Sequence, residues 1–299
     1  LTPDCSSVYA TTIPAASGER IVGDQDIAID AAGRTIITTR DELQFVRCDD
    51  DTCASATTIA IDAGAVQGET SVALDAHGNP VFTVTDTTSG GMVFVRCFDA
   101  DCASYATSTP TTESISNQLS LAVGSDGLPF ASFLDSGLQL ACLDEECSVV
   151  ATTTVSGAAT TSGPHTLVGA DGLPRRIHTV DGDVELVVCT SADCLSNTLY
   201  TLEDTTDVLG DRPFLGVQQT GDLVYAHINL TDDDLRVTTC LNGVCSSAST
   251  TEFTVSGEDS DPALAMLPDG RVAVFYTNIT DNEQIALFCN NDRCAENGP

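Results

Sequence analysis

The cysteines are the residues whose spacing points most directly to chemistry. Twelve of the thirteen form six pairs, with four residues between the two cysteines of each pair. Zinc and redox sites favour two intervening residues, and the four histidines do not accompany the pairs as metal sites would require. The spacing therefore predicts disulfides, and a repeated disulfide framework indicates an oxidising compartment and hence secretion. The predicted pairs are Cys48/Cys53, Cys97/Cys102, Cys142/Cys147, Cys189/Cys194, Cys240/Cys245 and Cys289/Cys294.

The predicted disulfides are expected to stabilise the outer edge of each repeat. We expect the two cysteines of a pair to face each other across an outer hairpin, as a non-hydrogen-bonded pair of strand residues. In the chain-entropy model a disulfide that closes so short a loop contributes roughly 2 kcal/mol.

Oxygen-bearing side chains recur at a second set of regular positions. The residue eight places beyond each recurring turn glycine is Asp or Asn in five of six repeats, and more polar residues precede the first strand of each repeat. These oxygen ligands suit a hard cation, so we predict a Ca²⁺ site, or sugar hydroxyls held through one. The alternative is that each side chain caps its own turn. The candidate ligands are Asp24, Asp26, Asp41, Glu69, Asp86, Asp135, Asp181, Asn229, Asp261 and Asn278.

The same carboxylates also allow a catalytic interpretation. A pair such as Asp86 and Asp135 would act as general acid and general base if it lay at the spacing that glycosidases use. The sequence contains no nucleophile elbow and no phosphate-binding loop. The arginines that would receive a substrate carboxylate are Arg175, Arg176 and Arg212.

The remaining polar motifs receive simpler interpretations. His178 and His227 fall on predicted strands, where we expect packed side chains, and His77 falls in a turn. The acidic loops between paired cysteines are expected to be exposed hairpin tips, with weak calcium binding as the alternative. The sequons that begin at Asn229 and Asn278 fit glycosylation of a secreted protein, a role that competes with cation binding by the same residues.

The elements that position these residues follow a repeat. The first cysteines of successive pairs are 49, 45, 47, 51 and 49 residues apart, a period typical of propeller blades. Each repeat reads as an apolar strand, a turn glycine, a second strand, a third strand ending in the first cysteine, and a Ser/Thr-rich fourth strand. This pattern predicts an all-β, six-bladed β-propeller with four antiparallel strands per blade. The turn glycines are Gly33, Gly78, Gly127, Gly172, Gly221 and Gly270.

The two ends of the sequence predict how the propeller closes. The sixth repeat has no fourth strand, whereas the residues after Asp4 match the other fourth strands, so residues 1–16 are predicted to complete blade 6. Cys5 then occupies the same place as Cys294. We predict the local pair Cys289/Cys294 with Cys5 unpaired, and Cys5/Cys289 is the alternative. The single domain, 1–299, then comprises blades at 17–62, 63–112, 113–156, 157–204, 205–256 and 257–299.

The charge of the chain excludes several classes of partner. The sequence has 44 acidic residues against 11 arginines and no lysine, a formal net charge of −33. Nucleic-acid backbones and anionic lipids require clustered cations, so neither is a predicted partner. No apolar run approaches the roughly 20 residues of a membrane helix, so we predict no membrane insertion. Self-repulsion at this charge predicts stabilisation by salt or by Ca²⁺.

Two repeats resemble a known group of proteins. The segments 125–129 and 170–174 each end in Asp-Gly-Leu-Pro, and each is followed by a cysteine pair. These segments resemble the repeats of secreted bacterial propeller proteins. The resemblance covers nearly the whole chain and implies a secreted six-bladed propeller, an architecture also found in sialidases. The chain departs from sialidases because it has no Trp and therefore no Ser-x-Asp-x-Gly-x-Thr-Trp box. It also has Arg20-Ile-Val where that family begins Arg-Ile-Pro.

The similarity among the blades guides the predicted function. No blade departs strongly from the others in sequence, whereas enzymes concentrate unusual residues in a few loops. We therefore predict a non-catalytic extracellular binding or scaffold module, adhesin-like or part of a larger surface assembly, with a protein or glycan partner. The alternative is an extracellular glycoside hydrolase or polysaccharide lyase with its site at the channel mouth.

Overall fold

The computed structural model describes residues 25–39, 43–50, 53–63, 68–86, 90–111, 115, 118–134, 137–155, 163–203, 209, 212–255, 262–267, 270–278 and 283–289. Within these ranges the chain is all-β, with 23 strands in six antiparallel sheets and no α-helix. Five sheets have four strands and the sixth has three among the described residues. The fold is the predicted six-bladed β-propeller, with one sheet per blade.

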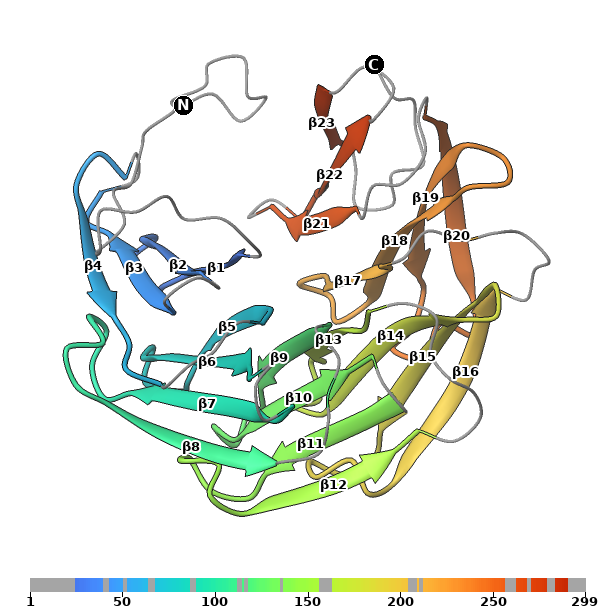
Figure 1. The fold of residues 1–299 in the computed structure, drawn as a ribbon. Helices are drawn as coiled ribbons and strands as arrows, with labels where there is room; N and C mark the ends of the chain where they lie inside the picture. Colours follow the sequence, from blue (N-terminus) through green and yellow to red (C-terminus); the bar gives the residue numbers. More distant parts are fainter. Residues whose placement is uncertain are drawn as a thin grey trace. The chain divides into compact units, whose positions relative to one another are not determined.

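Consecutive strands are neighbours in every sheet, so each blade is a simple meander (Figure 1). Blade 1 contains β1 (Gln25–Ile29), β2 (Thr35–Thr39), β3 (Gln44–Cys48) and β4 (Ala56–Ala60). Blade 2 contains β5 (Thr70–Leu74), β6 (Pro80–Thr85), β7 (Met92–Cys97) and β8 (Tyr105–Thr111). Blade 3 contains β9 (Leu119–Val123), β10 (Pro129–Phe133), β11 (Leu138–Cys142) and β12 (Val150–Thr154).

The later blades repeat this order. Blade 4 contains β13 (His165–Val168), β14 (Pro174–Val180), β15 (Asp183–Cys189) and β16 (Asn197–Glu203). Blade 5 contains β17 (Phe214–Val217), β18 (Leu223–Asn229), β19 (Asp234–Cys240) and β20 (Ala248–Thr254). Blade 6 contains β21 (Ala263–Met266), β22 (Val272–Asn278) and β23 (Glu283–Phe288).

The turn between the first two strands of each blade forms as its sequence predicts. All six turn glycines have φ between +79° and +88°, a region that glycine enters without a Cβ clash. An aspartate before the glycine holds the turn in several blades. In blade 1, for example, Asp30 Oδ1 accepts hydrogen bonds from the amides of Ala32 and Arg34 at 2.9 Å each. These turns fix the register of the strand pairs that carry the polar residues discussed below.

Disulfides close the connection between the third and fourth strands. Five predicted pairs, those of blades 1 to 5, are bonded, with Cα atoms 4.5 to 4.8 Å apart. Cys289 is also disulfide-bonded, to a partner outside the described residues. The five confirmed pairs are Cys48/Cys53, Cys97/Cys102, Cys142/Cys147, Cys189/Cys194 and Cys240/Cys245.

The second cysteine of each pair does not face the first across a strand pair, so that expectation was wrong. In blade 1, Cys48 is instead paired in the ladder with Ala56, three residues beyond its disulfide partner. Each second cysteine ends a tight turn, because its amide donates to the carbonyl three residues earlier at 3.0 to 3.2 Å. Its φ lies between +52° and +58°, in the left-handed region. The corrected positions, all outside strands, are Cys53, Cys102, Cys147, Cys194 and Cys245.

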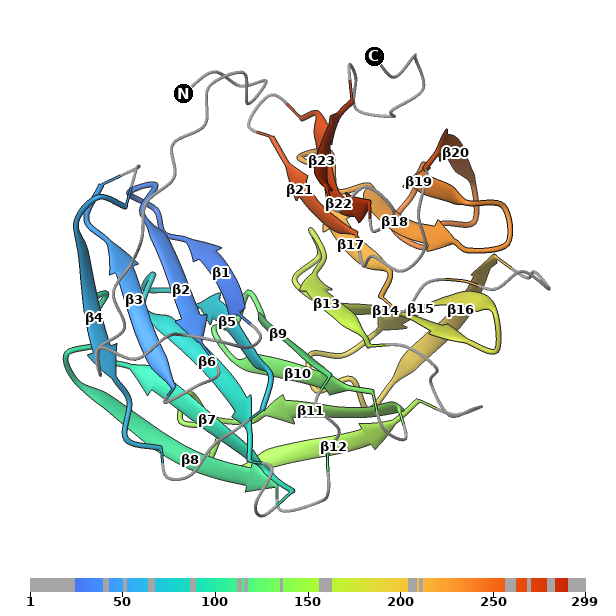
Figure 2. The same cartoon turned by 45° about the horizontal axis from the view of Figure 1, so that its top comes forward.

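The chain divides into two units, Leu1–Ala131 with Leu140–Thr152, and Ser132–Gln139 with Thr153–Pro299. In the first unit β5 lies beside both β1 and β9, and in the second β17 lies beside both β13 and β21 (Figure 2). Each unit has its own apolar core between sheets. Phe45 and Phe82 stack with ring centroids 6.5 Å apart in the first unit, and Ile177, Leu186 and Tyr225 pack in the second.

Several predictions fall outside the described residues. These are the closing segment 1–16 with Cys5, the ring candidates Asp24, Asp41, Asp135 and Asp261, and the cysteine Cys294. For Asn278 only the backbone, at the end of β22, is described. The blade boundaries proposed from the sequence also remain predictions.

Candidate functional site

The predicted acidic ring requires two loops of each blade to meet at one end of the sheet. One loop precedes the first strand, and the other joins the second strand to the third. The two loops meet in blade 2, where the amide of Thr85 donates to the carbonyl of Glu69 at 3.2 Å. They also do so in blade 5, where Leu209 forms an isolated bridge with Asn229. Hence Glu69 and Asp86 are close neighbours, as are the segment before β17 and the end of β18.

Asp26 has a structural task rather than an open ligand position. Its Oδ2 accepts a hydrogen bond from the Ser71 hydroxyl and another from the Val72 amide, both at 2.8 Å. Ser71 Oγ in turn accepts from the amide of Leu121 at 3.1 Å. Burial raises the pKa of Asp26, although these hydrogen bonds oppose the rise. The side chains thus join the first strands of three successive blades.

His165 performs the same task between blades 4 and 5. Its Nδ1 accepts a hydrogen bond from the amide of Leu215 at 3.3 Å, and its ring lies against Phe214 with centroids 3.7 Å apart. Burial lowers the pKa of His165 to about 4. The ring is therefore neutral at physiological pH, with its proton on Nε2.

Of two other ring candidates, Asn229 supports the turn-capping alternative and Asp181 lies in a turn. Asn229 is fully buried, and its Oδ1 accepts from the amide of Thr231 at 2.9 Å while its Nδ2 donates to Asp232 at 3.3 Å. Asp181 is exposed and has φ of +50°, in an Asp-Gly hairpin turn. Burial of the Asn229 amide also disfavours a glycan at that sequon, because the modified nitrogen must reach solvent.

The described residues contain no group of three or more His, Cys, Asp or Glu side chains placed to hold a metal ion. Asp26 and Asn229 are engaged by neighbouring protein groups, as shown above. A complete ring would need side chains outside the described ranges, so Ca²⁺ binding stays a prediction.

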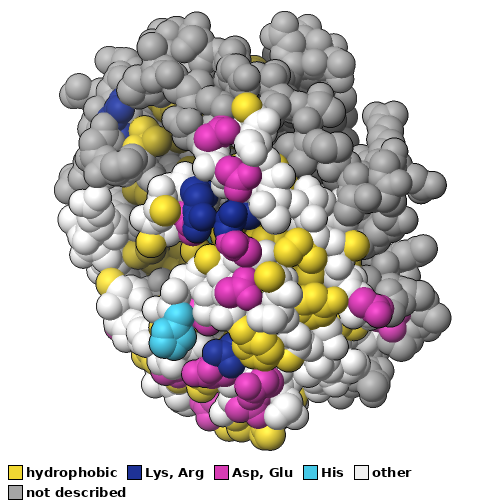
Figure 3. Space-filling view, turned by 90° about the vertical axis from the view of Figure 1, so that its left-hand side faces the viewer, with side chains coloured by type: hydrophobic (Ala, Val, Ile, Leu, Met, Phe, Trp, Pro, Cys, Tyr) yellow, Lys and Arg dark blue, Asp and Glu magenta, His cyan; other side chains and the backbone are white. Residues whose placement is uncertain are grey.

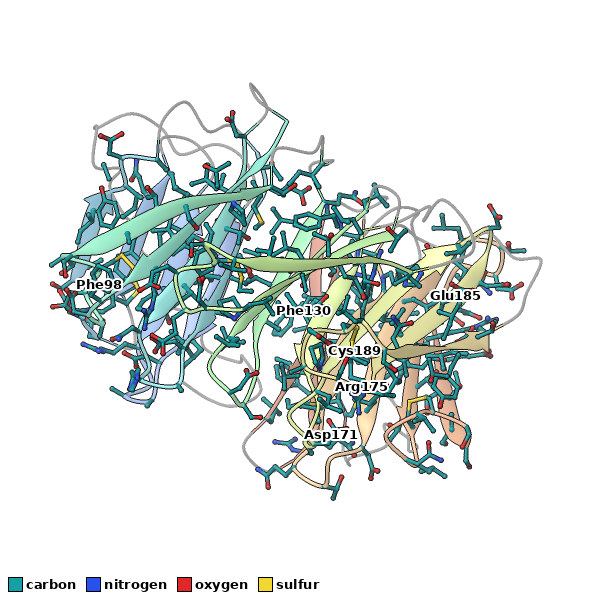
Figure 4. All side chains as sticks on the ribbon, turned by 90° about the horizontal axis from the view of Figure 1, so that it is seen from below. Phe98, Phe130, Asp171, Arg175, Glu185 and Cys189 are labelled. Carbon is teal, nitrogen blue, oxygen red and sulfur yellow. A yellow bond between two sulfur atoms is a disulfide. The ribbon has the colours of Figure 1, made fainter. Side chains whose placement is uncertain are left out.

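Two of the three arginines assigned to substrate binding, Arg175 and Arg176, are engaged by protein groups of blades 3 and 4. Arg175 donates to Asp171 Oδ2 at 2.6 Å and to the carbonyls of Leu173 and Pro174 at 3.2 Å (Figure 4). Arg176 is fully buried and donates to the carbonyl of Phe133 at 3.1 Å. Burial lowers the pKa of Arg176 to about 9. A substrate carboxylate would have to displace protein partners to reach Arg175, and it has no open path to Arg176.

The most distinctive polar cluster was not predicted from the sequence, and its first part lies within blade 4. His178 on β14 and Glu185 on β15 face each other in register, with Nε2 and Oε2 3.3 Å apart. His178 is fully buried, whereas 17% of the Glu185 side chain is exposed. Burial lowers the pKa of His178 despite its contact with Glu185, so the imidazole is neutral near pH 7.

The second part of the cluster joins blade 4 to blade 5. Glu203, at the end of β16, lies 3.3 Å from both His227 Nε2 and Arg236 Nη1. Its Oε1 also accepts a hydrogen bond from the Tyr225 hydroxyl at 3.0 Å. Burial alone would raise the pKa of Glu203, but these three neighbours outweigh it and lower the pKa. Glu203 is therefore a carboxylate at neutral pH, unsuited to act as a general acid.

The two parts of the cluster occupy opposite faces of blade 4. Ile177 and Leu186, which alternate along their strands with His178 and Glu185, pack in the same core as Tyr225. The His178/Glu185 pair must therefore face away from blade 5, whereas Glu203 faces toward it. The two carboxylates do not converge on one substrate position, so the cluster consists of two separate structural contacts, His178/Glu185 and His227/Glu203.

Blades 4 and 5 therefore depart chemically from the other blades, contrary to our expectation of near-equivalence. His178 and His227 each follow their turn glycine by six residues, a signal that the sequence offered. Glu185 and Arg236 each precede the first cysteine of their blade by four residues. The equivalents of the two histidines elsewhere are Thr39, Val84, Phe133 and Tyr276.

The acidic disulfide hairpins also have more structure than exposed tips would need. Asp99 accepts hydrogen bonds from the amides of Ala103 and Ser104, and these bonds lower the pKa of Asp99. Asp144 accepts from the hydroxyl and amide of Ser148, again with a lowered pKa. The residue two places after the first cysteine is therefore a cap for its own hairpin, which explains why it is Asp, Ser or Asn in every repeat.

Arginines from the preceding blade reach these hairpins in the first unit. Arg47 of blade 1 pairs with Asp101 of blade 2, and Arg96 of blade 2 pairs with Glu145 and Glu146 of blade 3. Arg96 also lies over the ring of Phe98, 5.8 Å from its centroid. These hairpins are linked to neighbouring blades through charge as well as through the backbone.

Comparison with known proteins identifies the fold. No family model and no curated protein sequence matches the chain. A catalytically inactive virginiamycin B lyase from Staphylococcus aureus, solved with quinupristin, matches with a TM-score of 0.62 at 11% identity, over 91% of this chain and 82% of that chain. Hydrazine synthase from Kuenenia stuttgartiensis matches at 0.60 and 14% identity, over 95% and 80%.

A third neighbour is YCF48 bound to a D1 peptide, with a TM-score of 0.55 at 11% identity over 85% of this chain and 74% of that chain. The neighbours therefore include enzymes and a peptide-bound protein, and one fold can host either kind of function. The described part of the chain has no helix long and apolar enough to span a membrane. At these identities the likeness shows the fold alone: the chain is a six-bladed β-propeller with a disulfide in each of at least five blades.

Proposed function

We propose that this chain is a secreted, non-catalytic binding or scaffold module, adhesin-like or part of a surface assembly, that presents a rigid acidic propeller to an extracellular protein or glycan. The observation that carries the proposal is the use of its polar groups. Asp26, His178 and Glu203 are engaged in contacts between strands and blades, not gathered at one open position. Such contacts suit a platform better than a reaction centre.

The disulfide hairpins support the proposed secretion and the proposed rigidity. Disulfides persist in oxidising compartments, and five of them recur at equivalent places in five blades. Each closes a short loop that is also held by an internal cap. A surface that is ordered before binding loses little conformational entropy when a partner docks.

Calcium assistance is the second part of the proposal. A net charge of −33 repels itself, and a divalent cation would screen it and organise the acidic loops. A calcium titration followed by thermal unfolding tests this part. We expect a higher Tm in millimolar CaCl2 than in EDTA at equal ionic strength, and an unchanged Tm would contradict it.

Binding arrays test the proposed function itself. The intact chain is applied to immobilised glycans and extracellular proteins, and the same ligands are analysed by mass spectrometry for turnover. We expect retention on a defined ligand without change in its mass, and loss of retention after reduction and alkylation of the disulfides. Release of shortened glycans or unsaturated products would instead establish the glycoside hydrolase or polysaccharide lyase alternative.

A further inference from the structure

Exposed apolar side chains gather on the disulfide hairpins. Among the described residues, eight large hydrophobic side chains are exposed, and five of these lie within two residues of a disulfide cysteine. Solvent-facing apolar groups at recurring positions indicate contact with a partner more strongly than scattered ones do. The five are Phe98, Leu143, Val149, Leu195 and Leu241.

In the first unit these side chains stand on a preorganised support. We name residues 96–104 of blade 2 with 142–149 of blade 3 the hairpin surface. Phe98 lies at the periphery of its blade (Figure 4). Its side chain is 50% exposed, and that of Leu143 is 49% exposed. The backbone of each hairpin is held by one disulfide and by one capping aspartate, Asp99 in blade 2 and Asp144 in blade 3. The ion pairs from Arg96 to Glu145 and Glu146 join the two hairpins directly.

The hairpin surface is also strongly acidic. It carries five carboxylates, and the only cations that reach it within the described residues are Arg96 and Arg47. The side chains of Asp101, Glu145 and Glu146 remain more than half exposed despite their ion pairs. Figure 3 shows Arg groups next to carboxylates and hydrophobic side chains on the face that it presents.

The exposed apolar side chains and the carboxylates of the hairpin surface together indicate which kind of partner would bind there. A second copy of the chain has no lysine and an excess of carboxylates, so like charges oppose self-association there. Anionic lipids and nucleic acids are repelled for the same reason. A protein segment with apolar side chains flanked by Lys or Arg satisfies both features, because its apolar groups cover Phe98 and Leu143 while its cations meet the exposed carboxylates.

We propose that the hairpin surface is a docking site for an apolar, cationic segment of a partner protein. The proposal rests on the binding role given above and specifies its protein partner. Blades 4 and 5 supply an internal control, because Leu195 and Leu241 are similarly exposed on hairpins of the same type. Within those two hairpins the only acidic residue is Asp193, so they offer apolar contact with little of the charge.

Fluorescence anisotropy with defined peptides tests the proposal on the intact oxidised chain. The probe is a labelled nine-residue peptide that alternates Lys and Leu, and the comparison peptides alternate Glu with Leu and Lys with Ser. We expect the Lys/Leu peptide to bind most tightly. The double change Phe98→Ser with Leu143→Ser should weaken it about ten-fold, whereas Leu195→Ser with Leu241→Ser should leave it within about two-fold.

The charge contribution has its own variant and salt dependence. Glu145→Gln with Glu146→Gln should weaken the Lys/Leu peptide several-fold and reduce its sensitivity to NaCl, because surface charge attraction is screened by salt. This variant keeps the apolar side chains, so it remains informative if the serine variant fails to fold. Equal binding by the Glu/Leu peptide, or unchanged binding by both double variants, would overturn the proposal.

The arrays described above separate this proposal from the proposed function. If the chain is retained on an array ligand and the Phe98→Ser with Leu143→Ser variant is retained equally, the docking site is wrong while the binding function stands. If the chain is retained on no array ligand but the Lys/Leu peptide binds through Phe98 and Leu143, the docking site is supported while the proposed function is not.

Discussion

Two regions of the chain join strands and blades through contacts between polar side chains, and these contacts lie at different depths. In blades 1 to 3, Arg47 and Arg96 reach carboxylates that are more than half exposed. In blades 4 and 5, His178 and His227 are fully buried, and their carboxylate partners are 17% exposed. Exposed ion pairs are weakened by solvent and salt, whereas removing one partner of a buried polar contact leaves the other without a hydrogen-bond partner, which is costly.

The difference teaches that the number of charges does not measure their importance for stability. Blades 1 to 3 contain most of the acidic hairpin residues, yet their ion pairs lie where water competes. Blades 4 and 5 contain few such residues, but the buried His178 and His227 each contact one carboxylate, Glu185 and Glu203 respectively. We therefore expect the second region to respond more strongly to substitution and to pH.

The largest expected effect comes from removing the carboxylate shared by blades 4 and 5. Glu203→Ala leaves His227, Tyr225 and Arg236 without their common partner. We expect the free energy of unfolding to fall by about 3 kcal/mol, measured by urea denaturation. Glu252→Ala is the matched control, because Glu252 contacts Arg236 at 3.3 Å from an exposed position. Equal losses in the two variants would remove the distinction between the buried and the exposed contacts.

Acidification should separate the regions next. The pKa of His165 falls from 6.5 to about 4 on folding, so between these values the unfolded chain binds a proton that the folded chain does not. Burial of His165 therefore does not lower the free energy of unfolding above pH 6.5, but it lowers this free energy progressively as pH falls from 6.5 toward 4. The lowered pKa of His178 adds to the loss in the same direction.

The hairpin aspartates act in a lower window. Asp99 and Asp144 have pKa values below their usual 3.8, so their contribution to stability is retained until pH falls below that value.

The variant His165→Asn tests the contribution of the histidine. We expect it to reduce the difference in unfolding free energy between pH 7 and pH 5 by about 2 kcal/mol. A pH dependence identical to that of the parent chain would contradict this assignment.

The smallest expected effect concerns the exposed pairs of the first region. Arg96→Gln breaks the contacts with Glu145 and Glu146, and we expect a loss of less than about 1 kcal/mol in low salt. In roughly 1 M NaCl, where the screening length is about 3 Å, the variant and the parent should unfold at nearly the same urea concentration. A loss as large as that of Glu203→Ala would show that these pairs are not weakened by solvent.

The sequence predicted what depends on local spacing. The cysteine pairs, turn glycines and strands were confirmed within the described residues because each involves residues close together in the chain. The His227/Glu203 contact was missed because it joins strands of different blades, whose relative placement a single sequence does not specify. The hairpin caps were also missed, although Asp99 and Asp144 occupy the same place after their cysteines and carried the signal.

The backbone of the disulfide hairpins was predicted less well than their pairing. Spacing alone does not distinguish a cysteine in the ladder from one that ends a turn, and Cys102 is of the second kind. The cap helps to explain the difference. Asp99 provides the carbonyl that accepts from the Cys102 amide, and its side chain accepts from the next two amides, so the fourth strand begins only at Tyr105.

The closure of blade 6 is the sequence prediction that needs its own measurement. Cys289 is disulfide-bonded, and we predict that its partner is Cys294 with Cys5 unpaired. Peptide mapping of the unreduced chain should therefore recover Cys289 linked to Cys294. A fragment linking Cys5 to Cys289 would reject that pairing and support covalent closure between the two ends.

The disulfide hairpins have a consequence for biogenesis. In each of the five bonded pairs the partners are five residues apart, so the correct partner is also the nearest thiol along the chain. A short loop gives this thiol a far higher effective concentration than any cysteine of another blade. We therefore expect each crosslink to form as soon as its hairpin meets oxidising conditions. A chain with thirteen cysteines can then oxidise blade by blade, with little demand for an isomerase to correct mispaired bonds.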